Sequence, residues 1–317
     1  MANTQNSSIE RKIYYYDLVV YTKDGNKKLQ MNVGNYLRKI LEEIYVQNQE
    51  IMKCEEPEKQ KEKIDKISVK TDNDDILYII VDEFEDQKPV KARIVLCRQD
   101  AFPFIEKNGQ LSNMTSEVTG EFAVAEVTHC VIYPEEYFMG AEYNFNGARP
   151  SSIAGYLRMM SDDIVDMKCE GRLRNDVFNR ILEEKGYSLF DISFRNTPEM
   201  LIEIRNHMPF IQAFIQNIED VDSYEVIMRR RLSKKKKGFD LQLSTKEIEE
   251  FVTTNREDIK RFKVCQGAYS DSVDLLKDKL VHTQEFVLTK NKVIESSEMY
   301  DAIIDFYNKQ FRDNLTN

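Results

Sequence analysis

The pattern of apolar positions in the first part of the chain predicts strands, interrupted by one long helix. Aromatic and β-branched residues fill 13–21, and a turn at 23–26 leads to a returning stretch at 28–33, which together predict a β-hairpin. From Asn35 to Ile51 the apolar positions recur at helical spacings, which is typical of a helix with one buried face. Further strands are predicted over 66–70, 76–84, 90–98, 121–127 and 128–133.

Helical and strand-like patterns alternate in the rest of the chain. Pro150 suits a first helical turn, so a helix is predicted from there to about residue 160. Thr197 and Pro198 begin another helix that extends to about residue 218, and Pro209 should kink or split it. The other predicted helices cover 175–185, 244–252, 272–280 and 297–311, and the other predicted strands cover 187–195, 224–231, 239–243, 260–269 and 282–289.

The change of pattern near residues 146–152 divides the chain into two predicted domains and indicates an α+β fold. The length of 317 residues fits about two domains of roughly 150 residues each. Residues 1–145 are predicted to form a β-rich domain with one long helix, which would scaffold the protein and offer a surface for a homodimer. Residues 146–317 are predicted to form an α+β domain that carries a basic hairpin loop.

Composition narrows the class of protein. Hydrophobic residues at 41% and charged residues at 32% allow a real core under a well-solvated surface. No apolar stretch approaches the length of a membrane span and the N-terminus is polar, so we expect a cytoplasmic protein without membrane insertion. The five cysteines are scattered and form no C-x-x-C pair, which argues against a disulfide framework or a zinc knuckle.

Glycine usage bears on cofactors. Only 11 glycines occur and no two are closer than seven residues apart, so neither a G-x-G-x-x-G loop nor a Walker loop is present. Nucleotide binding through those two loop types is excluded, and no cofactor is assigned.

The strongest local signal is a run of cations near residue 230. In a chain whose formal net charge is −10, seven of nine successive residues are basic and none is acidic. Such a run suits phosphate contacts, because released counterions drive the affinity, and seven contacts to duplex DNA would give a salt slope of roughly −6. A solvated hairpin tip that keeps an edge strand soluble, or a contact with an acidic protein or lipid surface, explains the same run. The seven cations are Arg229, Arg230, Arg231, Lys234, Lys235, Lys236 and Lys237.

Three further arginines are candidates for nucleic-acid contacts if the basic run binds a polyanion. Arg172 and Arg174 precede the helix predicted at 175–185, where phosphate could also meet free backbone N–H groups. Arg149 lies in a similar position before the helix that starts at Pro150. Each could instead be a helix cap or a partner in a surface salt bridge.

Catalysis is weakly supported by the sequence. The three histidines are far apart, and neither H-E-x-x-H nor G-x-S-x-G occurs, so no catalytic residue and no metal ligand is assigned. Clustered acids flank the predicted strand at 76–84, as a two-metal nuclease would need. A divergent metal-dependent nuclease is therefore one alternative, and solvated strand ends are the other explanation of these acids.

Residues 134–149 are rich in aromatic side chains beside asparagine, glycine and Arg149. Partly exposed tyrosines make good recognition surfaces, because one end is apolar and the other end hydrogen bonds. The alternative function is accordingly a protein-docking subunit or inhibitor that uses this segment and an acidic surface. A core seam between the two halves of the chain explains the same residues without a ligand.

Three stretches carry a resemblance to known proteins: IYYYDLVV near the start, HCVIYPEEYFMGAEYN in the middle and SEMYDAIIDFYNKQF near the end. They resemble an uncharacterised family of bacterial and phage proteins of about this length. More distantly, the order of elements is similar to the DNA-binding B subunit of Kiwa anti-phage systems. The resemblance implies a non-catalytic, DNA-associated role in phage–host conflict beside a partner protein, and it transfers no functional residue.

The leading hypothesis is therefore a non-catalytic nucleic-acid-binding protein that contacts the DNA or RNA backbone through the basic run. Contacts to the backbone alone would make this affinity independent of sequence.

Overall fold

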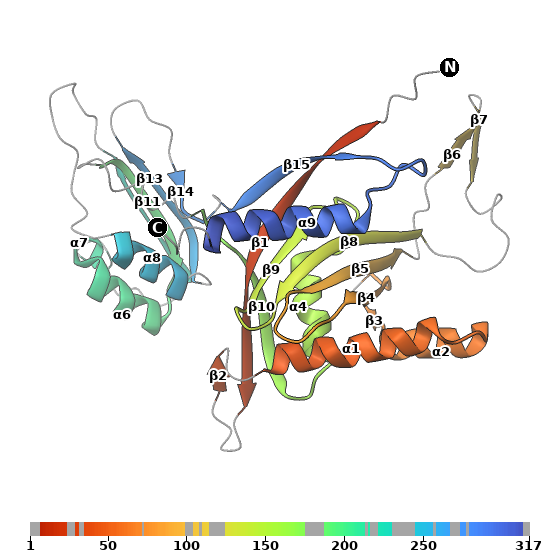
Figure 1. Ribbon diagram of the computed structural model, residues 1–317. Helices are drawn as coiled ribbons and strands as arrows, with labels where there is room; N and C mark the ends of the chain where they lie inside the picture. Colours follow the sequence, from red (N-terminus) through yellow and green to blue (C-terminus); the bar gives the residue numbers. More distant parts are fainter. Residues whose placement is uncertain are drawn as a thin grey trace. The chain divides into compact units, whose positions relative to one another are not determined.

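A computed structural model shows the arrangement of the chain (Figure 1). It divides into two compact units, Met1–Arg172 with Val281–Asn317, and Leu173–Leu280, here called the first and second units. The structure describes residues 7–23, 29–31, 35–71, 73–98, 104–107, 110–113, 124–174, 187–212, 215, 221–229, 245–255, 258–266, 273–276 and 279–312.

A large antiparallel sheet forms the centre of the first unit. Its long strand β1 (Ser8–Lys23) pairs with β15 (Val281–Val287) near its start and with β2 (Leu29–Met31) near its end. The main path of the sheet runs β10 (Ile164–Gly171), β1, β9 (Phe138–Glu142), β8 (Val124–Tyr133), β5 (Val90–Arg98), β4 (Ile76–Glu83) and β3 (Val69–Lys70). A separate short pair is formed by β6 (Phe104–Lys107) and β7 (Gln110–Asn113).

Helices cover both faces of this sheet. Side chains alternate between the faces of a strand, so Leu18 packs into the core with α1 (Tyr36–Met52) and α4 (Pro150–Met159), whereas Tyr15 faces α9 (Ser296–Tyr307). The Tyr15 ring stacks on Phe306 at 5.0 Å, and its hydroxyl donates to the carbonyl of Ile303 at 3.2 Å. Figure 1 shows α9 lying across the sheet. Helix α2 (Pro57–Lys66) follows α1, and a π-helical turn (Asn308–Arg312) follows α9.

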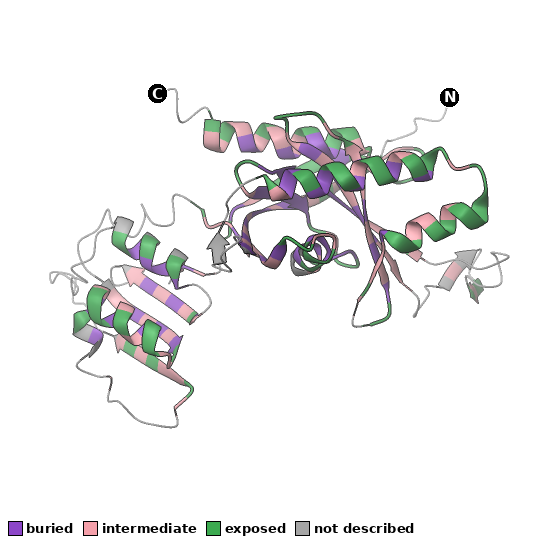
Figure 2. Ribbon diagram, turned by 90° about the horizontal axis from the view of Figure 1, so that it is seen from below, coloured by how far each residue is buried: buried purple, intermediate pink, exposed green. Residues whose placement is uncertain are grey.

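The second unit has two layers. Its antiparallel sheet runs β12 (Ser223–Arg229), β11 (Tyr187–Arg195), β13 (Ile259–Gln266) and β14 (Val273–Asp274). Phenylalanines of β11 and β13 pack with α6 (Pro198–His207) and α8 (Thr245–Thr254), which gives one core cluster that α7 (Pro209–Gln212) completes. Alternate residues of the strands carry charge instead, as in the ion pair of Arg261 with Asp191 at 2.8 Å. Figure 2 shows the buried and exposed stripes that result.

The α+β class and most expected elements are confirmed. The hairpin at 13–33, the helix after Asn35 and the split at Pro209 are present, although β1 begins earlier, at Ser8. The structure describes no helix that is long and apolar enough to cross a membrane. The helix predicted at 175–185 and the strand predicted at 239–243 lie outside the described residues.

Several expectations were wrong. The strands predicted at 121–127 and 128–133 form one strand over their described part, β8. Residues 273–274 belong to β14 rather than to a helix at 272–280, because they pair with β13. The sequence analysis also missed β9 and β10.

The division of the chain differs from the predicted boundary between residues 145 and 146. Helix α4 and strand β10 stay with the first unit, and the chain returns to that unit at Val281. The apolar face of α9, with Tyr300 and Ile303 buried, packs on the first sheet. That contact joins distant parts of the chain, which a local pattern cannot reveal.

Candidate functional site

The basic run lies almost entirely outside the described part of the chain. Arg229 is the last residue of β12. The other six cations, Arg230, Arg231, Lys234, Lys235, Lys236 and Lys237, lie outside the described residues, so their role stays a prediction.

Arg172 is engaged in contacts within the first unit. Its backbone N–H donates to the carbonyl of Tyr15 at 2.7 Å, and its Nη1 lies 2.6 Å from Oδ1 of Asp17. The guanidinium also lies over the rings of Phe138 and Phe311, at 5.7 and 5.3 Å from their centroids. Its charge is therefore balanced by a carboxylate of the first unit. Arg174, two residues further along, is exposed and belongs to the second unit.

Arg149 has a different environment. It is exposed at the start of α4, and its guanidinium lies 6.0 Å from the ring centroids of both Tyr143 and Phe145. Tyr143 and Phe145 are 41% and 72% exposed. Tyr14 of β1 lies against Tyr143, with 5.7 Å between ring centroids. We call Tyr14, Tyr143, Phe145 and Arg149 the Arg149 surface.

The loop that carries the Arg149 surface is anchored to the sheet. The Asn144 side chain donates to the carbonyl of Val127 at 2.9 Å, and the backbone N–H of Gly147 donates to the carbonyl of Asn144 at 3.2 Å. Asn144 Oδ1 also accepts from the N–H of Asn146 at 3.2 Å. A Cβ on Gly147 would overlap the buried hydroxyl of Thr128, so a residue without a side chain is required there. These contacts fix the backbone of the loop that carries Phe145 and Arg149.

Charge balance separates Arg149 from three similar arginines. Within the described residues, Arg38 lies over Phe84, Arg172 over Phe138 and Phe311, and Arg312 over Tyr307. Each of these also has a carboxylate partner: Arg38 with Glu135, Arg172 with Asp17 and Arg312 with Glu136. Arg149 makes no ion pair with any described residue. Of these four arginines, Arg149 is therefore the one without a carboxylate partner in the described part of the chain.

An arginine beside two exposed rings can perform a limited set of tasks. Guanidinium groups bind phosphate through paired hydrogen bonds and stack on planar rings. Exposed aromatic rings stack on unpaired bases, and tyrosine and arginine are also enriched at the energetic centres of protein interfaces. The site therefore suits a single-stranded nucleic acid or a protein, and it holds no group that would perform covalent chemistry.

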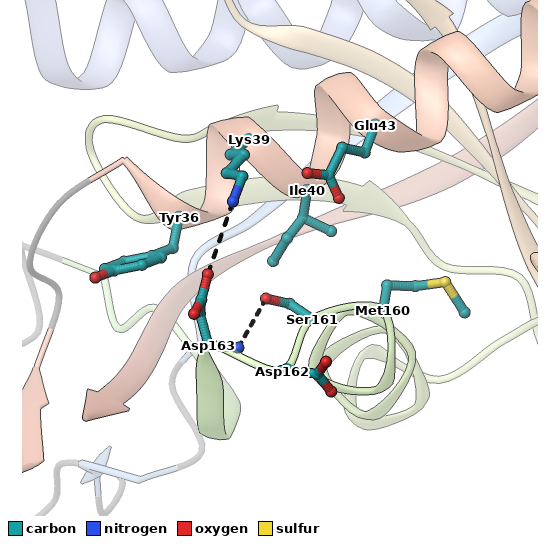
Figure 3. A pocket seen from close by; sticks show the side chains of 8 residues that line it. All are labelled: Tyr36, Lys39, Ile40, Glu43, Met160, Ser161, Asp162 and Asp163. Atoms are coloured by element: carbon teal, nitrogen blue, oxygen red, sulfur yellow. Dashed lines mark hydrogen bonds and ion pairs between the residues drawn. The ribbon is translucent and has the colours of Figure 1, made fainter. Parts of the chain in front are cut away.

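The described residues also line two hollows. One, of about 300 Å³, lies between α1 and the turn after α4 (Figure 3), where Lys39 is 3.8 Å from Asp163 and Glu43 and Asp162 add further negative charge. The only cation among its lining residues is thus already paired, which disfavours an anionic ligand. The other, of about 620 Å³, lies between β15 and α9 and contains His282, stacked on Phe306 at 4.5 Å. Burial lowers the pKa of His282.

The acids that the sequence analysis connected with a nuclease are arranged differently. Asp82 forms a two-pronged ion pair with Arg93, at 2.7 and 2.8 Å, and accepts from the hydroxyl of Tyr300 at 2.5 Å. Within the described part of the chain, no group of three histidine, cysteine, aspartate or glutamate side chains is placed to hold a metal ion.

Sequence reasoning identified Arg149 and included Phe145 in the aromatic segment 134–149, but it missed Tyr14. The available signal was the succession of aromatic residues at 143 and 145 directly before Arg149. It could not separate a buried seam from an exposed surface, because aromatic residues occur in both. The structure shows both outcomes within 134–149: Phe138 is buried in the interior and Phe145 is exposed.

No curated protein matches the chain. A model of a family of unknown function, DUF6731, matches residues 93–315 and therefore most of the chain. This match agrees with the expected likeness to an uncharacterised family. The chain belongs to the DUF6731 family.

Proposed function

We propose that this protein binds single-stranded nucleic acid, with the Arg149 surface contacting one or two nucleotides and the basic run 229–237 contacting the backbone. The observation that carries the proposal is that Arg149 lies over two exposed rings and has no ion-pair partner among the described residues. The proposed site of action is the cytoplasm.

The Arg149 surface and the basic run are expected to contribute binding free energies that depend differently on salt. Stacking of a base on an aromatic ring contributes about 1–3 kcal/mol and varies little with salt, since every base has a π-face. Contacts of lysine and arginine with phosphate weaken as salt rises, by a slope of about 0.7 per contact for a single strand. The basic run should therefore set the salt dependence, and the Arg149 surface should set the preference for unpaired over paired bases.

A role in phage–host conflict is part of the proposal. It is supported by the resemblance in element order to the DNA-binding B subunit of Kiwa anti-phage systems and by the similarity of three stretches to bacterial and phage proteins. The expected setting is a complex with a second protein on nucleic acid.

Fluorescence anisotropy tests the proposal with labelled single strands and duplexes longer than about 16 nucleotides, which exceeds the length that one single-strand-binding fold covers. Titrations at about 50 mM and about 200 mM salt should show tighter binding of single strands and a strong loss of affinity with salt. Replacing Lys234, Lys235, Lys236 and Lys237 with glutamine should reduce the salt slope by about 3. Lack of binding to any single strand, or an unchanged slope in this variant, would contradict the proposal.

Protein docking is the second candidate, because Tyr143, Phe145 and Arg149 are residue types that dominate protein interfaces. Pull-down from the native host after nuclease treatment separates the two functions. A stoichiometric partner that is lost with Phe145→Ala would favour docking, whereas material that disappears after nuclease treatment would favour nucleic acid. Size-exclusion chromatography of the purified protein tests the homodimer that is expected through the first domain.

A further inference from the structure

A row of polar side chains crosses the first sheet beneath the start of α9. His129 on β8 lies opposite Arg93 on β5. On its other side, the β8–β9 register, with Cys130 opposite Ala141, places Glu142 beside His129 on the same face. Asp82 on β4 extends the row through its ion pair with Arg93. A polar row under a helix is costly unless every member has a partner.

Three members of this region have the connectivity of an acyl-transfer triad. Nε2 of His129 lies 2.9 Å from Oγ of Ser296, and Nδ1 lies 2.9 Å from Oε1 of Glu142. The same carboxylate oxygen accepts the backbone N–H of His129 at 3.0 Å, which fixes its position. A carboxylate beside Nδ1 selects the neutral tautomer that carries its proton on Nδ1. Nε2 is then a free acceptor, and the Ser296 hydroxyl donates to it.

The exposure of the three side chains increases from the carboxylate to the serine, as a triad requires. The Glu142 side chain is 6% exposed and the His129 side chain is 10% exposed. Ser296 is only partly buried, and both of its sequence neighbours, Glu295 and Ser297, are exposed. The orienting acid is therefore kept from water, whereas the residue that carries the hydroxyl is partly exposed to solvent. Triads are recognised by such geometry and not by sequence position.

The helix does not use the Ser296 hydroxyl as a cap. Ser296 is the first residue of α9, the N-cap is Glu295, and the Glu295 side chain caps no backbone N–H. The N–H groups of the first turn lack carbonyl partners within the helix, and Ser297 and Glu298 follow Ser296 in that turn. Backbone N–H groups in this position can bind an oxyanion.

We propose that Ser296, His129 and Glu142 form a serine esterase site, distinct from the proposed nucleic-acid surface. Ser296 Oγ attacks the ester carbonyl and passes its proton to Nε2 of His129, and the alcohol leaves with that proton. Water then attacks the acyl-serine and gives its proton to Nε2. The carboxylic acid departs as Oγ regains the proton. Ser296 is the nucleophile, His129 is the general base, and Glu142 is a positioning residue.

The surroundings indicate the class of substrate. Glu295 directly precedes Ser296 and Glu298 lies in the same first turn, and both are exposed. Negative charge at these positions repels anionic substrates, including nucleic acid, and favours neutral or cationic ones. Small neutral esters of carboxylic acids are therefore the expected substrates.

Covalent labelling of the wild-type full chain is the direct test. A fluorophosphonate probe should label Ser296, as located by peptide mass spectrometry, and p-nitrophenyl acetate should be hydrolysed above the buffer rate. Ser296→Ala should abolish labelling and reduce hydrolysis to background. Ser7→Ala is the control, because it removes an exposed hydroxyl of the first unit that has no part in the proposed site, and it should retain both activities.

Glu142→Gln tests the positioning role. It should lower kcat by about a hundredfold or more and change the pH–rate profile, with little effect on KM. If this variant fails to fold, as thermal melting would show, the wild-type labelling still decides. Wild-type protein that is not labelled at Ser296, or Ser296→Ala protein that hydrolyses the ester at the wild-type rate, would overturn the proposal.

Discussion

Arg172 and Arg149 both belong to the first unit and both lie over two aromatic rings, yet their charges are used differently. Arg172 is paired with Asp17 and contacts Phe138 and Phe311. Arg149 contacts two exposed rings and has no carboxylate partner among the described residues. The comparison shows that an arginine over an aromatic ring is not by itself a binding signal. We propose that a binding site is distinguished by exposed rings together with an arginine that has no carboxylate partner among the described residues.

The largest effect is expected from a substitution that displaces the loop carrying Arg149. Gly147→Ala would place a Cβ against Thr128 Oγ1 and the Asn144 side chain, so overlap should destabilise the protein by about 1–3 kcal/mol. The displaced loop should also weaken binding of single strands. Urea unfolding and anisotropy measure the two effects.

Gly155→Ala is the matched control for that substitution. It lies in α4, where a Cβ meets nothing within 4 Å, so it should stabilise the helix by about 0.5–1 kcal/mol. Equal stability of the two alanine variants would show that the packing of the loop on β8 is unimportant.

The second prediction compares the effect on stability of replacing each of the two arginines with glutamine. Arg172→Gln removes an ion pair and two ring contacts at a half-buried position, and we expect a loss of about 1–2 kcal/mol in the free energy of unfolding. Arg149→Gln should change that free energy by less than about 0.5 kcal/mol, as exposed substitutions usually do. Thermal melting of both variants measures the difference, and a larger loss at Arg149 would reverse the comparison.

Most local elements could be predicted from the sequence, and the partners of the candidate site could not. The helix after Asn35 and the split at Pro209 depend on spacing and on one missing N–H, which are local properties. By contrast, β9 has a short, fully buried pattern with no alternation, so it was missed. The assignment of α9 to the first sheet depends on contacts between distant parts of the chain.

The same limit applies to side chains. Arg149 was predicted from its position before a helix, but the pairing of Arg172 with Asp17, 155 positions away, could not be. His129 and Ser296 are 167 positions apart and meet only through the fold. Sequence spacing can suggest which residues could bind a ligand. Which charged side chains form ion pairs with each other becomes known only when the pairing of the strands is known.

The third prediction concerns the rings. Phe145→Ala removes a 72% exposed ring and should weaken binding of single strands by about tenfold, since stacking contributes about 1–3 kcal/mol per base. Its effect on duplex binding and on stability should be small. Met159→Ala, at an exposed apolar side chain of α4, is the control and should leave affinity unchanged. Equal losses in both variants would indicate a nonspecific effect of surface hydrophobicity.

The fourth and smallest effect is a pH dependence at another balanced arginine. Hydrogen bonding from Arg38 lowers the pKa of Glu135 below its ordinary value of 4.5. The folded state therefore binds this proton less well than the unfolded state. The stability that the pair contributes should be present above about pH 4.5 and lost as the pH falls through the folded pKa.

Glu135→Gln should remove that part of the acid sensitivity. Urea unfolding of both proteins between about pH 3 and about pH 7 measures it. Parallel curves for the wild type and the variant would show that the pair does not contribute to acid stability.

The most direct test of the central claim compares two exposed arginines of the same helical region. Arg149 precedes α4 and lies over two rings, whereas Arg158 lies in its last turn and contacts no ring among the described residues. Anisotropy titration of one labelled single strand at low salt should show about tenfold weaker binding for Arg149→Gln and less than about twofold for Arg158→Gln. Equal losses for the two variants, or an unchanged affinity for Arg149→Gln, would contradict the proposed role of Arg149.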